Sequence, residues 1–340
     1  MYNIEQEVKM RILIILICLL SALSIFGERL TTFLQLSKPV LIKVGENLIC
    51  INEGMTVFLY DLNDFKLIKK FGRKGEGPGE FSSDLEINIL KEKIMIESQG
   101  KLSFYSFKGN LIKEMRRLPK YRRLKLLEDR YVAASGILSK EVYHSVAMIL
   151  DANFNELKTF YQDEARYHQQ KQVTNFSTAW YFDVSEKKCF IVGSADFKID
   201  VFNKNGDPLY TISPKYERVK VSQEFIDAWF ESIKKRRGME RYNSAKKRVR
   251  FPEFFPAIRD LIVDNGHVYV LTFRRAQEKS EFFIFDLEGK LVKQTFLPLK
   301  PLENYVGVFF FPYCINNNYL YQLIDNEEDE VWELQRFSIL

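Results

Sequence analysis

The chain has 340 residues, of which 46% are hydrophobic and 14% aromatic, and its formal net charge is only +5. This length and hydrophobic content exclude an intrinsically disordered protein and allow a large buried core. The 29 Phe and 17 Tyr favour β-structure, and with so small a net charge any basic character must be local to matter.

The N-terminus has the pattern of an export signal. Lys9 and Arg11 precede an apolar run over residues 12–26, which is short for a membrane span but typical of the apolar region of a signal peptide. We expect cleavage after Ser24 or Gly27, which places the protein outside the cytoplasm, periplasmic or secreted. The alternative is that residues 1–27 remain as an N-terminal membrane anchor.

The cysteines that follow this segment do not form a recognisable metal or disulfide pattern. Cys50, Cys189 and Cys314 are far apart, odd in number and without C-x-x-C spacing. We expect buried free thiols in strands, and the sequence predicts no metal and no cofactor.

Residues 71–81, FGRKGEGPGEF, raise the question of a phosphate-binding loop. The glycines run as G-x-G-x-G, Pro78 lacks a backbone N–H, and the following residues alternate like strands rather than starting a helix. The stretch therefore predicts a tight connection between two strands, in which Gly75, Gly77 and Gly79 supply positive φ values.

A strand–turn–strand unit recurs along the chain. The residues that open the turns are 45, 45, 52 and 83 positions apart, and they are Asp61, Ser106, Asp151, Asn203 and Asp286. A period near 45 is typical of propeller blades made of four short antiparallel strands. The five turn residues mark five repeats. A second pattern, an apolar strand after a polar turn, occurs six times from GENLICI to NNYLYQL and therefore predicts six blades. The sequence thus predicts an all-β protein, with residues 28–340 forming one six-bladed β-propeller.

The longest spacing contains an insertion between the fourth and fifth blades, at about residues 215–256. Ser222 is placed to cap a helix, and the apolar side chains from Phe225 to Ile233 recur at helical spacing. Gly238 is a residue that can end this helix.

The last repeat has room for only three strands before Leu340. Residues 30–36, LTTFLQL, are apolar and otherwise unassigned, so we expect them to supply the missing outer strand and close the ring. The alternative is a frayed last blade with an open edge.

The stretch FGRKGEGPGEF resembles the segment that joins consecutive blades in NHL-type propellers, although Ser82 and Ser83 stand where the NHL segment continues with proline. Residues 28–340 resemble a family of exported six-bladed propellers of unknown function that is related to NHL-repeat proteins. The resemblance implies the fold and does not by itself imply an activity.

Basic residues gather in three of the predicted links between blades. Each link joins an outer strand to the next inner strand, and in a propeller such links lie on one face around the channel mouth. We therefore predict a positive ligand-binding face. Its candidate residues are Arg73, Lys74, Arg116, Arg117, Arg122, Arg123, Lys234, Lys235, Arg236 and Arg237. The alternative is a scattered, solvated set of charges neutralised by acids such as Glu76 and Glu80.

The sequence favours a binding or interaction module over an enzyme. The partner expected at the basic face is an anionic ligand, a glycan, a lipid surface or an acidic protein, whereas nucleic acid is not expected. One alternative is a channel-centred hydrolase or lyase of the lactonase or NHL-lyase type, with Glu86, Asp183, Asp260 and Asn316 as candidate catalytic residues. A second alternative is a structural subunit of a cell-envelope complex.

Overall fold

The structure is a computed structural model that describes residues 27–82, 84–116, 121–139, 142–163, 167–168, 173–174, 180–185, 187–302 and 309–340. The first 26 residues of the predicted signal at 1–27 and the candidate Arg117 lie outside the described residues. Among the described residues, no helix combines the length and the apolar character needed to cross a membrane.

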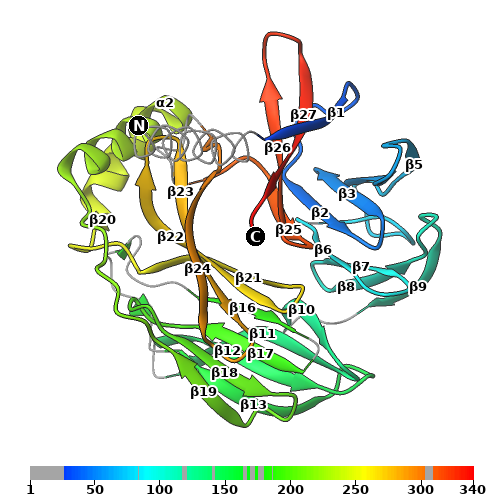
Figure 1. Ribbon diagram of the computed structural model, residues 1–340, viewed down its shortest axis with the longest axis horizontal. Helices are drawn as coiled ribbons and strands as arrows, with labels where there is room; N and C mark the ends of the chain where they lie inside the picture. Colours follow the sequence, from blue (N-terminus) through cyan, green and yellow to red (C-terminus); the bar gives the residue numbers. More distant parts are fainter. Residues whose placement is uncertain are drawn as a thin grey trace, which may run out of the picture.

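Six antiparallel sheets follow one another around a ring, as the repeat predicted (Figure 1). Blade 1 contains β2 (Leu41–Gly45), β3 (Leu48–Glu53), β4 (Thr56–Asp61) and β5 (Leu67–Phe71). Blade 2 contains β6 (Glu86–Ile89), β7 (Ile94–Ser98), β8 (Lys101–Tyr105) and β9 (Leu111–Arg116). Blade 3 contains β10 (Arg122–Leu127), β11 (Arg130–Ser139), β12 (Val142–Leu150) and β13 (Glu156–Gln162), and the short β14 (Tyr167–His168) pairs with β12.

The second half of the chain completes the ring. Blade 4 contains β16 (Tyr181–Val184), β17 (Lys188–Val192), β18 (Ile199–Asn203) and β19 (Pro208–Ile212). Blade 5 contains β21 (Ile258–Asp264), β22 (His267–Ala276), β23 (Lys279–Asp286) and β24 (Leu291–Pro298). Blade 6 contains β25 (Tyr313–Asn316), β26 (Tyr319–Asn326), β27 (Val331–Ser338) and the N-terminal β1 (Glu28–Phe33).

The innermost strands β2, β6, β10, β16, β21 and β25 surround a central channel, and β25 contacts β2 where the ring closes. At one end of the channel the chain passes from the outer strand of each blade to the inner strand of the next. We call this the linker end. The opposite end, where each inner strand turns into the second strand of its blade, is called the turn end.

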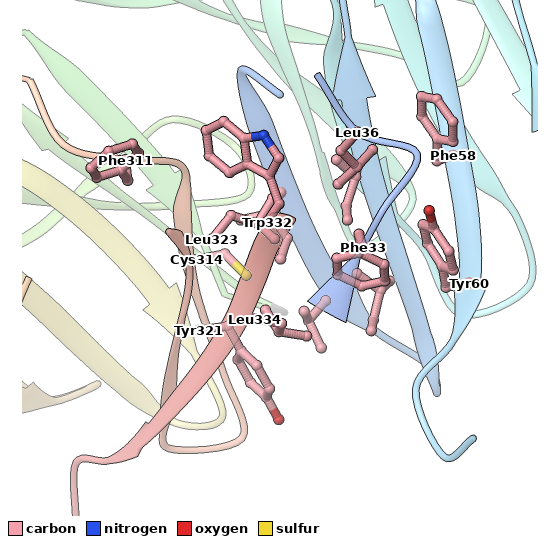
Figure 2. Close-up of a cluster of buried hydrophobic side chains, with 14 residues drawn as sticks. Phe33, Leu36, Phe58, Tyr60, Phe311, Cys314, Tyr321, Leu323, Trp332 and Leu334 are labelled. Carbon is pink, nitrogen blue, oxygen red and sulfur yellow. The ribbon is translucent and has the colours of Figure 1, made fainter. Parts of the chain in front are cut away.

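The N-terminal strand closes the ring, as predicted. β1 pairs antiparallel with β27 from Glu28, opposite Arg336, to Phe33, opposite Trp332. The strand begins two residues earlier than the predicted segment 30–36 and ends three residues before it. Phe33 packs against Tyr60 of blade 1 with 4.5 Å between the ring centroids (Figure 2). The two ends of the chain are therefore joined to the first blade by one apolar cluster.

Six buried apolar clusters lie among the described residues, one between each pair of neighbouring blades. A blade is covered on both faces, so its middle strands read as continuous apolar runs rather than as alternating ones. Strand β3 is an example, because its first five residues, LICIN, are all buried. Cys50, Cys189 and Cys314 are free and buried in strands, which confirms the prediction made for them.

The repeated turn residues have a common chemistry. In each, a side-chain oxygen accepts backbone N–H groups two or four residues further on, which holds the turn between the third and fourth strands of a blade. The five residues are Asp61, Ser106, Asp151, Asn203 and Asp286.

The glycine stretch is the link between β5 and β6. Its N–H groups already have partners, because Gly77 donates to Glu80 Oε2 at 2.9 Å and Gly79 donates to Glu114 Oε2 at 3.0 Å. Gly75 and Gly79 have positive φ values of 157° and 71°. Gly77 does not have a positive φ, so the expectation for that residue was wrong. The additional positive φ in this link, 83°, belongs to Gly72.

The insertion between blades 4 and 5 is helical. α2 (Gln223–Arg248) begins at Ser222, whose side chain accepts the N–H of Phe225 at 3.1 Å, and it is followed by β20 (Val249–Arg250). β20 pairs in parallel with the short β15 (Val173–Thr174), which precedes blade 4.

Gly238 interrupts α2 with φ 80° and ψ 174°, so it ends a first helical segment as expected. A second segment, which the sequence did not lead us to predict, then runs to Arg248. The chain doubles back at the glycine, because the rings of Phe230 and Tyr242 are only 6.2 Å apart. One straight helix would separate these positions by about 18 Å. The insertion is therefore a helical hairpin.

Candidate functional site

A polar cavity of about 710 Å³ occupies the turn end of the channel. All six inner strands contribute to it, chiefly through their last residues and the turns that follow. The inner strands supply charged and amide groups from Lys43, Asn88, Lys125, Asp183, Asp264 and Asn316. The turns that follow these strands add Glu46, Asn47, Asn265 and Asn317.

Asp183 connects three blades inside this cavity. One carboxylate oxygen lies 3.3 Å from the ammonium of Lys125 in blade 3. The other accepts the backbone N–H of Val263 in blade 5 at 2.9 Å. Because these partners come from the blades on either side of its own, Asp183 fixes the relative positions of three inner strands.

Asp264 makes the equivalent connection between blades 5 and 6. Its carboxylate accepts the backbone N–H of Asn317 at 2.7 Å and the side-chain amide of Asn316 at 3.4 Å. Burial raises the pKa of the Asp264 carboxyl, although these hydrogen bonds oppose the rise. The cavity wall therefore presents a carboxylate whose orientation is fixed.

Lys43 is the exception in this wall. Its residue is only half-buried, and within the described part of the chain no hydrogen bond or ion pair holds its ammonium. Its positive charge nevertheless acts on its surroundings, since it lowers the pKa values of the nearby Asp260 carboxyl and Cys314 thiol against the larger effect of burial. Lys43 is thus a cation in a polar cavity without a direct partner.

The four candidate catalytic residues occupy different surroundings. Asp183 and Asn316 line the cavity, whereas Glu86 and Asp260 do not. Asp260 accepts a hydrogen bond from the hydroxyl of Tyr313, and burial raises its pKa. Among the described residues, no three His, Cys, Asp or Glu side chains are grouped so that they could hold a metal ion.

Glu86 lies at the linker end, where it begins β6 and pairs across the sheet with Glu97. Burial raises the pKa of the Glu97 carboxyl to about 6, and the charge of Glu86 adds to this rise. The backbone N–H of Leu124 donates to Glu97 at 3.1 Å and opposes it. This carboxylate pair is therefore separated from Asn316, which lies at the far end of its own inner strand.

The candidate basic residues within the described part of the chain belong to links or strand ends at the linker end of the ring. Arg73 is exposed but paired with Glu80 at 2.7 Å, and Lys74 is exposed beside it. Arg122 and Arg123 begin β10, where Arg123 donates to the carbonyl of Trp180 at 3.5 Å. Arg116 ends β9, but its side chain lies outside the described set.

The remaining candidates lie on the helical hairpin. Lys234, Lys235 and Arg237 are exposed near the end of its first segment, and Arg236 is half-buried. The second segment adds four exposed cations, Arg241, Lys246, Lys247 and Arg248. The hairpin thus carries more basic residues than the four single candidates that the sequence indicated.

Aromatic contacts hold the hairpin on blade 5. Phe225 meets Phe255 with ring centroids 4.9 Å apart, and Phe255 stacks on Phe273 of β22 at 4.5 Å. Trp229 of the hairpin contacts Phe251, which follows β20, with ring centroids 5.3 Å apart. The apolar face of α2 is covered in this way, so the basic side chains are left facing solvent.

A smaller cavity of about 430 Å³ lies where the link from blade 4 meets the insertion. Its wall includes Tyr216, Arg218 and Phe254, and the guanidinium of Arg218 lies 5.5 Å from the centroid of the Phe254 ring. The main chain of Glu217 is already bound, because its carbonyl accepts a hydrogen bond from Arg274 at 2.8 Å. The channel cavity is larger than this one and exposes more polar groups, so it is the stronger candidate for a small-ligand site.

Lys43 and Lys125 were not recognised from the sequence. Each is the single lysine of its strand, in LIKVG and RRLKLL, and such a residue is equally typical of an exposed strand edge. A signal was nevertheless present, because every inner strand carries a polar residue at or after its midpoint.

Comparison with known proteins supports the fold. No protein-family model matches the chain, and no curated protein is significantly similar to it. A candidate exported protein from Bacteroides fragilis is 15% identical with a TM-score of 0.55, over 92% of this chain and 94% of that one. A member of the DUF4221 family from Bacteroides vulgatus is 11% identical with a TM-score of 0.54, over the same shares of the two chains. At such low identity the similarity shows the fold alone: the protein is a six-bladed β-propeller.

Proposed function

We propose that this protein is an exported binding propeller that holds an anionic partner on the basic surface at its linker end. The observation that carries the proposal is the helical hairpin α2, which is added to the propeller between two blades and exposes a dense set of cations. We call its seven exposed basic residues the hairpin cations. They are Lys234, Lys235, Arg237, Arg241, Lys246, Lys247 and Arg248.

The charges of this set are largely uncompensated. Lys234 lies 3.5 Å from Glu231, and Lys246 lies over the rings of Phe230 and Tyr242. For the other five hairpin cations, the described residues provide no ion pair. Like charges held close together on a folded element repel one another, and an anionic partner relieves that repulsion. The total charge of the protein is only +5, so this local excess is not a property of the whole surface.

Two further observations support the exported, binding character. Lys9, Arg11 and the apolar run at 12–26 have the features of a signal peptide. One of the solved structures that share the fold is a candidate exported protein. Arg73, Lys74, Arg122 and Arg123 belong to the same end of the ring as the hairpin and extend the proposed surface.

The test is a binding measurement with an acidic polysaccharide, heparin, and with vesicles that contain phosphatidylserine, each at low and high ionic strength. Binding is expected to weaken as salt rises, because the Debye length falls from about 10 Å at 0.1 M salt to about 3 Å at 1 M. The double variant Lys235→Glu with Arg241→Glu should bind about tenfold more weakly or worse, since each basic residue near an anionic surface contributes roughly 1 kcal/mol.

The matched control is Lys108→Glu with Lys290→Glu, which changes the net charge by the same amount. Both control lysines are exposed in turns between the third and fourth strands of their blades, at the turn end. If the hairpin variant and this control bind equally well, or if binding does not depend on salt, the basic surface is not the binding site.

A further inference from the structure

The channel cavity lies at the opposite end of the ring from the hairpin cations, so a ligand there would not compete with a partner at the basic surface. Its volume of about 710 Å³ falls within the range of roughly 300–1,000 Å³ that is usual for small-molecule sites. Six different strands supply its wall, and their packing fixes the positions of its polar groups before any ligand arrives.

The cations of the cavity indicate one negative charge on the ligand. Lys43 has an ammonium without a direct partner in the described part of the chain, whereas Lys125 is already paired with Asp183 at 3.3 Å. A free ammonium in a partly buried wall is stabilised by an anion. The carboxylates of Glu46, Asp183 and Asp264 line the same space and repel additional negative charge. A monoanion therefore suits the cavity better than a phosphate dianion.

The rest of the polar wall indicates hydroxyl groups on the ligand. Asp183 accepts the backbone N–H groups of Val184 and Val263 and pairs with Lys125, whereas Asp264 accepts from Asn316 and from the backbone of Asn317 and Asn318. Because a carboxylate can accept about four hydrogen bonds, each carboxylate has about one position left. Asn88 donates its side-chain amide to the carbonyl of Leu124 at 3.1 Å, and its side-chain oxygen is a further acceptor in the wall. Acceptors that remain open to the cavity can take hydrogen bonds from donors on a ligand, and hydroxyl groups supply such donors.

We propose that this cavity binds a sugar acid, that is, a small molecule with one carboxylate and several hydroxyl groups. The carboxylate pairs with the ammonium of Lys43. The hydroxyl groups donate to Asp183, Asp264 and Asn88, and the side chain of Asn316 borders the same space. Binding involves no covalent step. The ligand supplies the anionic partner that the Lys43 ammonium otherwise lacks.

The test is isothermal titration of the full-length protein with sodium D-glucuronate, D-galacturonate and D-gluconate. Neutral D-glucose and inorganic phosphate serve as comparison ligands. We expect at least one of the three acids to bind, and to bind more tightly than either comparison ligand. If none of the acids binds at millimolar concentration, or if glucose or phosphate binds as tightly, the proposal is wrong.

Variants locate the site. Lys43→Met keeps the length and apolar stem of the side chain but removes its charge, and it should weaken binding of the acid by about tenfold or more. Lys43→Arg keeps the charge and should retain most of the binding. The control is Lys38→Met, which changes an exposed lysine in the segment before β2. Equal affinity in Lys43→Met and Lys38→Met would overturn the proposal, and circular dichroism of each variant verifies that it is folded.

Discussion

Replacing Phe33 by alanine tests whether the N-terminal strand holds the ring closed. Phe33 is only 3% exposed and is the one fully buried residue of β1. It belongs to the apolar cluster between blades 6 and 1, beside Tyr60 and close to Trp332 (Figure 2). Truncation of a buried phenylalanine typically costs about 3–5 kcal/mol, and loss of an aromatic pair accounts for roughly 0.5–1.5 kcal/mol beyond the buried area. We expect Phe33→Ala to lower the free energy of unfolding by about 3 kcal/mol or more.

The next residue supplies a matched control. Leu34 is 82% exposed, so Leu34→Ala should change the free energy of unfolding by no more than about 0.5 kcal/mol. Urea unfolding followed by circular dichroism measures the global transition, and tryptophan fluorescence, to which Trp332 of the cluster contributes, provides a second probe. A cost below about 1 kcal/mol for Phe33→Ala, or equal costs for the two variants, would show that β1 does not stabilise the ring.

Three further predictions concern other parts of the fold. Gly72→Ala should destabilise the protein by about 2 kcal/mol or more, because φ is 83° and the new Cβ would lie 2.7 Å from the backbone oxygen of Met55. Gly77→Ala, without a positive φ, should cost clearly less in the same urea titration. Burial raises the pKa of Glu97 from the ordinary 4.5 to about 6. Between these two pH values the Glu97 carboxyl holds more protons in the native protein than in the unfolded chain. The free energy of unfolding should therefore fall as pH rises through this window. Glu97→Gln should remove that slope and stabilise the protein at pH 8 by up to about 2 kcal/mol, and an unchanged slope would contradict this assignment. Burial raises the pKa of the Cys189 thiol, so peptide mapping after iodoacetamide should find it modified only under unfolding conditions.

The sequence by itself determined the features that depend on local chemistry. Polar residues such as Asp61 and Asp286 open turns because their side chains bind nearby backbone N–H groups, and that chemistry repeats with the blades. Ser222 caps a helix for a similar local reason. The missing strand of the last repeat followed from the need to cover a sheet edge, and β1 covers it. The turns and the helix cap require no knowledge of which distant residues meet, whereas the β1 pairing was predicted from the unpaired edge of the last repeat.

The features that depend on distant contacts were decided only by the tertiary structure. The sequence predicted that Gly238 ends a helix, and the structure agrees. Only the contact between Phe230 and Tyr242 in the structure shows that the chain doubles back there. Lys43 and Asp183 are 140 positions apart in the chain, and they line one cavity only because six blades close into a ring. Local sequence propensity cannot predict that these two residues line the same cavity. Their proximity arises from packing between sheets rather than from the sequence neighbours of either residue.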